Sequence, residues 1–269
     1  MNPHHLGHSG SGVFETAVLL TVLVLAGGYL ALALERSREP RGWSRWRSAS
    51  FLAGCALLLF GLLSPLSPFP AGDFRGHMHQ HLLVGMYAPL GLVLGAPITL
   101  LLRSLSPRNG SRMGRLLRSR PVHLVANPVV ALGLNLGGLA ALYFTPLYLA
   151  TTFSPTLHHL MLAHFLLAGC LFAWVIAGPD PAHRRPSVRV RLVVLGVAIL
   201  GHAVLAQLIY AGAFVYLPGM AADERRGAGD LMYYGGDIAE LLLALALVTT
   251  WRQLRQRSSV SRNGHAALR

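Results

Sequence analysis

Residues 77–102 read HMHQHLLVGMYAPLGLVLGAPITLLL, and this stretch decides the fold class. Its last 21 residues contain no charged side chain, and about 20 apolar residues cross the hydrocarbon core of a membrane at about 1.5 Å per residue. Six more apolar stretches occur, at residues 13–34, 49–66, 128–150, 157–177, 192–217 and 231–251. The sequence therefore predicts an all-α, polytopic membrane bundle of seven transmembrane helices at 13–251. A short outer segment (1–12) precedes this domain, and a basic cytoplasmic tail (252–269) follows it.

Composition and charge agree with this class and set the expected topology. The chain has 269 residues, of which 53% are hydrophobic and only 12% charged, which is too apolar for an ordinary soluble domain. All 23 basic residues are arginine, and 20 of them follow the first, third, fifth and seventh stretches. Because cytoplasmic loops are enriched in basic residues, we expect the N-terminus outside and the C-terminus in the cytoplasm. The net charge of +13 then faces anionic lipid headgroups, so nucleic acid is not an expected partner.

Histidines gather where two of these stretches begin on the expected outer side. His77 and His81 open the third stretch, and His158 and His159 open the fifth. Ionisable groups in apolar runs usually mark a pathway, a proton relay or a ligand site. His77 and His81 are four residues apart, so they share a helix face and are predicted to be close enough to share a metal. Imidazoles beside the thioether of Met78 favour copper among biological metals.

Deeper ionisable groups extend this pattern. His164 lies further along the fifth stretch, His202 lies in the middle of the sixth, and Asp237 and Glu240 lie in the seventh. Burying His202 or either carboxylate alone would cost several kcal/mol, so mutual pairing is expected. The predicted metal ligands are His77, His81, His158, His159 and His164, with His202 and Asp237 at an inner position.

Each of these groups also has a purely structural interpretation. His77, His79 and His81 would then bond water at the level of the lipid headgroups. His164 would bond a carbonyl freed by a helix kink, and the pairing of His202 would only pin two helices together. The N-terminal histidines, His4, His5 and His8, are not expected to form a defined site.

Several motifs together resemble the CtaG family of cytochrome c oxidase assembly factors, in its multi-spanning bacterial form. They are the histidine run at 77–83 with Ala-Pro at 88–89 and Gly-Ala-Pro at 95–97, LMLAHFLLAG at 160–169 with Trp174 and Gly-Pro-Asp-Pro at 178–181, Gly-His-Ala at 201–203, Asp-Glu at 223–224, and YYGGDIAE at 233–240. The resemblance implies a multi-pass protein of the bacterial plasma membrane that is not an enzyme. It also implies cytochrome c oxidase subunits and membrane lipid as partners, and a part in supplying copper to the oxidase.

The leading hypothesis is therefore an assembly factor that binds copper at outer-leaflet histidines and delivers it to a haem-copper oxidase. A copper transporter across the plasma membrane is one alternative. A haem- or quinone-linked membrane oxidoreductase, with paired histidines as axial ligands, is another. A retinal protein is excluded, because the chain has no lysine to form the Schiff base.

Overall fold

The computed structural model describes residues 8–63, 66–70, 72–181 and 185–266, and it describes side chains between residues 12 and 252 of these ranges. All regular elements in this part of the chain are helices. They are α1 (His8–Ser37), α2 (Arg45–Leu62), α3 (Phe74–Leu82), the π-helical turn η3 (Leu83–Tyr87), α4 (Ala88–Leu94), α5 (Pro97–Ser104), α6 (Pro107–Leu117), α7 (Arg120–Val125), α8 (Pro128–Phe144), α9 (Leu147–Phe153), α10 (Pro155–Ile176), α11 (Val188–Ala211) and α12 (Ala222–Ala266).

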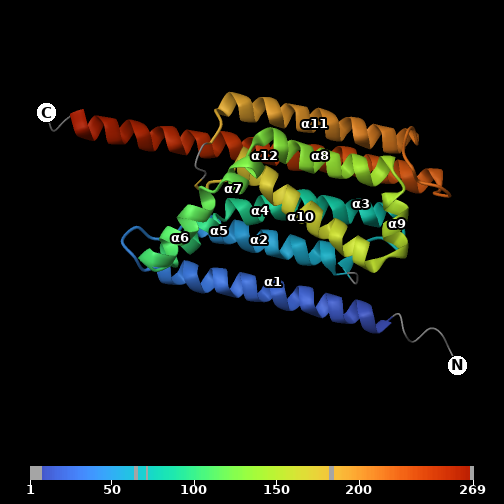
Figure 1. Cartoon of the computed structure of the whole chain (residues 1–269), viewed down its shortest axis with the longest axis horizontal. Helices are drawn as coiled ribbons and strands as arrows, with labels where there is room; N and C mark the ends of the chain where they lie inside the picture. The colour runs from blue at the N-terminus through green and yellow to red at the C-terminus, as the bar shows by residue number, and fades with distance from the viewer. Residues whose placement is uncertain (1–7, 64–65, 71, 182–184, 267–269) are drawn as a thin grey trace.

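The long helices lie side by side along one direction (Figure 1). At one end of the bundle, here called the histidine end, α3, α10 and α12 begin and α9 lies across them. At the opposite end, here called the arginine end, lie α5, α6, α7 and the arginine-bearing linkers that follow α1 and α10. The basic linkers thus gather at one end, as the charge pattern predicts.

Within the residues that the structure describes, five helices are long and apolar enough to cross a membrane, and the pair α8 and α9, bent by 76°, would make a sixth. The predicted span at 49–66 corresponds to α2, whose 18 residues begin with Arg45, Trp46 and Arg47 and are therefore less apolar. The all-α membrane bundle is confirmed. The count of seven spans and the sidedness of the termini stay predictions. α1 begins at His8, and the rest of the predicted outer segment, with His4 and His5, lies outside the described residues.

The predicted third span is a broken helix that passes through the middle of the bundle. It contacts α2 and α10 along η3 and α4, and its first part, α3, packs on α12. Gly169 on α10 allows this packing, because a Cβ there would stand 2.1 Å from the carbonyl oxygen of Gly85 in η3. The helix stops at Gly95, where Ala96 adopts a left-handed conformation (φ 53°) before Pro97 starts α5. π-helical turns of this kind occur frequently at functional sites.

A loop residue holds this break in place. Asp180, in the linker after α10, is 2% exposed, and its carboxylate accepts hydrogen bonds from the backbone N–H groups of Ile98 (3.1 Å) and Thr99 (2.7 Å). The Thr99 hydroxyl donates a third bond, at 2.5 Å. The carboxylate thus satisfies N–H groups that the first turn of α5 leaves without helical partners. The Gly-Pro-Asp-Pro motif is structural here, because it ties the α10–α11 linker to the start of α5.

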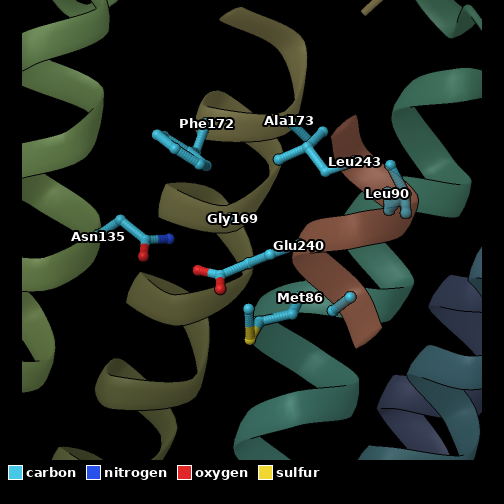
Figure 2. Close-up of a pocket in the computed structure, with 10 residues that line it drawn as sticks. Met86, Leu90, Asn135, Gly169, Phe172, Ala173, Glu240 and Leu243 are labelled. Atoms are coloured by element: carbon cyan, nitrogen blue, oxygen red, sulfur yellow. The ribbon is translucent and has the colours of Figure 1, made fainter. Parts of the chain in front are cut away.

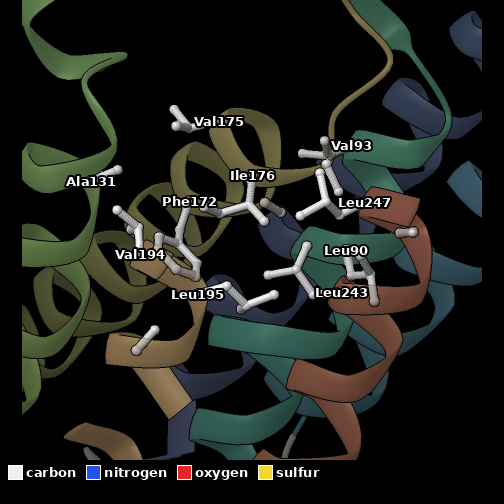
Figure 3. Close-up of a cluster of buried hydrophobic side chains, with 14 residues drawn as sticks. Leu90, Val93, Ala131, Phe172, Val175, Ile176, Val194, Leu195, Leu243 and Leu247 are labelled. Carbon is white, nitrogen blue, oxygen red and sulfur yellow. The ribbon is translucent and has the colours of Figure 1, made fainter. Parts of the chain in front are cut away.

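Apolar side chains fill the arginine half of the bundle (Figure 3). The cluster draws on α4, α8, α10, α11 and α12, and its labelled members are Leu90, Val93, Ala131, Phe172, Val175, Ile176, Val194, Leu195, Leu243 and Leu247. Each Å² of apolar surface that such a core buries stabilises the fold by about 25 cal/mol. Its consequence for function is that polar groups near the histidine end are closed off from the arginine end by packed hydrocarbon.

Candidate metal-handling site

A cavity of about 530 Å³ opens at the histidine end, between α2, α3, α9 and α10. Four histidines line it: His77 and His79 from α3, and His158 and His159 from the first turn of α10. The rings of His158 and His159 have centroids 6.2 Å apart, and His159 stacks on Phe14 of α1 at 3.7 Å. The structure thus brings His77, His158 and His159 together from two helices.

Tyr143 of α8 orients the His77 ring. Its hydroxyl lies 3.1 Å from Nε2 of His77 and donates to Sδ of Met78 at 3.9 Å. The same hydroxyl thus contacts both the imidazole of His77 and the thioether of Met78, and it fixes the orientation of the His77 ring. A hydrogen bond at one ring nitrogen is the arrangement that orients a metal-binding imidazole, and the other nitrogen is the one that can bind the metal. Sequence reasoning did not single out Tyr143, since only tertiary packing places a mid-chain tyrosine beside these residues.

An acidic group stands at the rim of the cavity. Asp73 is the N-cap of α3, and its carboxylate accepts a bond from the backbone N–H of Arg75 (2.8 Å). The guanidinium of Arg75 also pairs with it at 2.6 Å and holds the pKa of Asp73 below its usual range. The carboxylate is therefore ionised at neutral pH, and the guanidinium of Arg75 balances its charge.

His81 does not line this cavity, although it lies one helical turn beyond His77. It is 4% exposed, packs against Phe165 at 4.7 Å, and faces His202 of α11, with ring centroids 6.2 Å apart. His202 is 2% exposed. All four ring nitrogens of the two residues lack a hydrogen-bond partner in the described part of the chain. His81 thus lies beside His202 rather than in the cavity with His77, and the prediction that His77 and His81 share a metal stays a prediction.

The expected pairing of His202 with a carboxylate is absent from the described residues. Glu240 is buried, yet its Oε2 has no partner. Figure 2 shows its side chain directed into a small pocket between Asn135 of α8 and Met86 of η3. Asp237 is only partly buried, so Glu240 is the deeper carboxylate of the two. The α12 residue that packs on His202 is Gly236, where a Cβ would stand 2.4 Å from Nδ1 of the ring.

His164 contacts a backbone carbonyl, as its structural interpretation predicts. Its Nε2 lies 3.2 Å from the carbonyl oxygen of Leu134, and the ring packs over Gly138, both on α8. Within the described side chains, no group of three or more His, Cys, Asp or Glu residues is placed to hold a metal ion. The cavity therefore offers imidazoles from two helices.

Comparison with known proteins gives one family. The model described as cytochrome c oxidase caa3 assembly factor (Caa3_CtaG) matches residues 27–254. An uncharacterized protein of Mycobacterium leprae (strain TN) is 29% identical over 272 residues, which are 94% of this chain and 41% of that protein. Uncharacterized proteins of Mycobacterium bovis and Mycobacterium tuberculosis are 30% identical over the same shares. The chain thus spans about two fifths of the length of these curated relatives. No solved structure is significantly similar to it.

Proposed function

The chain belongs to the cytochrome c oxidase caa3 assembly factor family, and from this premise we propose that it supplies copper to a haem-copper oxidase. In this proposal it is a multi-pass protein of the bacterial plasma membrane that accepts copper at the histidine-end cavity. It delivers the ion to an oxidase subunit and catalyses no reaction. The arginine-rich linkers at the opposite end support an outer position for the cavity, because basic loops stay in the cytoplasm.

One observation supports the copper assignment above the others: imidazoles from α3 and α10 line one open cavity. Imidazole accepts copper in either oxidation state, and a nearby thioether favours Cu(I). Met78 lies beside His77 through their shared contact with Tyr143. Together these features support loading from the outside and release to a partner.

A copper transporter remains the second candidate, favoured by one observation. Glu240 lies four residues beyond Gly236 on α12 and thus about 6 Å deeper than the His202 contact, so polar groups continue past the histidines. They end at the apolar cluster of the arginine half, because Leu243 and Leu247 occupy the next turns of the same helix face. The packed cluster favours delivery within the outer half over passage across the membrane.

The test is a strain that lacks this protein. We expect its haem-copper oxidase to lose most of its activity and its copper, and both to return with the wild-type protein. A variant with alanine at the four cavity histidines should restore neither, whereas His123→Ala, an exposed histidine of α7 at the arginine end, should restore both. Unchanged oxidase copper in the deletion strain would refute the proposal, and reduced total cell copper with intact oxidase would favour the transporter.

A further inference from the structure

We propose that His81 and His202 form a second copper site inside the bundle, in which one Cu(I) ion is held by two imidazole nitrogens in a nearly linear arrangement. The inference rests on the proposed function, since it takes the cavity as the point of entry. It adds a specific inner site, a coordination number and an oxidation state to that function.

The distance between the two rings fits this geometry. A metal–imidazole bond is about 2.0 Å long, and each nitrogen lies about 1.1 Å from its ring centre, so two rings on one ion in a straight line have centres about 6.2 Å apart. The centroids of His81 and His202 are 6.2 Å apart, with planes inclined by 37°. No hydrogen bond joins the two rings in the described residues, and the separation of their centres equals that of two imidazoles on one ion in this geometry.

The surroundings of the rings support a bound ligand. Buried polar groups in native proteins nearly always have a hydrogen-bond partner. Here two buried imidazoles from different helices lie with their ring centres 6.2 Å apart, and none of their nitrogens has a hydrogen-bond partner in the described residues. Two glycines make room for the rings: a Cβ on Gly85 would stand 3.3 Å from Nδ1 of His81, and a Cβ on Gly236 would collide with His202. The packing thus holds the two imidazoles at a specific separation but gives their nitrogens no hydrogen-bond partner in the described residues.

The number and kind of ligands select Cu(I). Zn²⁺ takes four ligands in structural sites and at least three protein ligands in catalytic sites. The described side chains hold no group of three His, Cys, Asp or Glu that would supply them. Cu(I) is soft, has a filled d shell and is stable with two nitrogen ligands. Its single charge also makes burial less costly than that of a divalent ion.

Glu240 supplies the counter-charge in this arrangement. Its pocket is lined by Gly85, the residue under the His81 ring, and Glu240 lies one turn beyond Gly236, the residue under the His202 ring. Glu240 thus lies near both glycines that contact the rings, and its Oε2 has no hydrogen-bond partner in the described residues. We assign Glu240 as a positioning residue that lowers the cost of a buried cation, and it does not need to contact the ion.

The test is X-ray absorption at the copper edge, on purified full-length protein loaded with Cu(I) under anaerobic conditions. The variant with alanine at the four cavity histidines isolates the inner site. We expect it to bind one equivalent of Cu(I) with two nitrogen ligands, at close to the roughly 2.0 Å of metal–imidazole bonds. Adding His81→Leu and His202→Leu should abolish this signal, and adding Glu240→Gln should weaken Cu(I) binding about tenfold with the two-nitrogen spectrum kept. His123→Ala is the matched control and should change nothing.

A measurement on the wild type avoids dependence on variants that fail to fold. Its spectrum should contain the two-nitrogen component in addition to that of the cavity. If wild-type protein binds Cu(I) only with three or four ligands, the inner site is refuted and the cavity proposal stands. If ordered water rather than copper bridges the rings, the cavity-deficient variant binds no Cu(I), which also refutes the inner site. If wild-type protein binds no copper at all, the copper part of the proposed function fails with it.

Discussion

Two buried polar sites in this protein contrast sharply. At the arginine end, the carboxylate of Asp180 accepts three hydrogen bonds from Ile98 and Thr99. Nearer the histidine end, the rings of His81 and His202 are as deeply buried and have no hydrogen-bond partner in the described residues. A satisfied buried group contributes to stability, whereas an unsatisfied one costs free energy and persists only for another reason. The first site therefore holds the fold, and the second is available for a ligand.

Removing Asp180 should have the largest effect on stability. In Asp180→Ala, two backbone N–H groups and one hydroxyl lose their acceptor, and we expect the free energy of unfolding to fall by about 3–5 kcal/mol. Asp180→Asn keeps an acceptor oxygen and should lose less than half of that. Denaturant unfolding in detergent micelles measures both. An alanine variant as stable as wild type would show that this site is not structural and would remove the contrast.

The histidine half depends instead on close helix packing, which a glycine substitution tests. Gly169→Ala places a Cβ against the carbonyl of Gly85, so α10 must move away from η3. We expect a loss of about 1–3 kcal/mol, typical of overpacking. Gly133→Ala on α8 is the control, because a Cβ there meets open space, and it should be neutral or stabilise by about 0.5–1 kcal/mol. Equal unfolding curves for the two variants would contradict the close contact.

Tyr143→Phe tests the orientation of the His77 ring with little effect on folding. The change removes the hydroxyl that contacts His77 and Met78, and the loss of stability should be only about 1 kcal/mol. Copper affinity should fall more clearly, by about 10–100-fold, because the contact that orients the ring of His77 is lost. Competition with a Cu(I) chelator measures this affinity. Tyr148→Phe, whose ring packs on His77 at 4.9 Å, is the control and should retain wild-type affinity.

The smallest effect on stability is expected from His202→Leu. Replacing an unsatisfied buried polar group by an apolar one of similar volume is often neutral, so the free energy of unfolding should stay within about 1 kcal/mol of wild type. The same variant should fail to restore oxidase activity in the deletion strain. Large destabilisation would mean that His202 has a structural partner, and normal oxidase assembly would mean that the pair has no function.

The sequence was sufficient for the fold class and for one half of the site. Apolar length predicts the helices, and the arginine pattern predicts that the basic linkers share one end. The positions of His77, His158 and His159 at helix starts predict that they meet, because neighbouring antiparallel helices bring alternate ends together. These predictions depend on distance along a helix axis, which sequence position fixes at about 1.5 Å per residue.

Rotation about each helix axis was not predictable in the same way. Membrane helices are apolar on most faces, so no polar stripe indicates which side meets which neighbour. For this reason the pairing of His81 with His202, the turn of His164 toward Leu134, and the deeper placement of Glu240 than of Asp237 emerge only from packing. The π-helical turn and the Asp180 cap also depend on tertiary contacts, although Pro97 and the Gly-Pro-Asp-Pro motif mark where the cap occurs.

The most direct test is the amount of Cu(I) that the purified full-length protein binds at its outer cavity. Wild-type protein and the variant with alanine at the four cavity histidines are titrated anaerobically against a chelator, with His123→Ala as the control. We predict that the cavity variant binds one equivalent fewer than wild type and the control. Equal copper binding by all three proteins, or none by wild type, would contradict the assignment of this cavity as the point where copper enters.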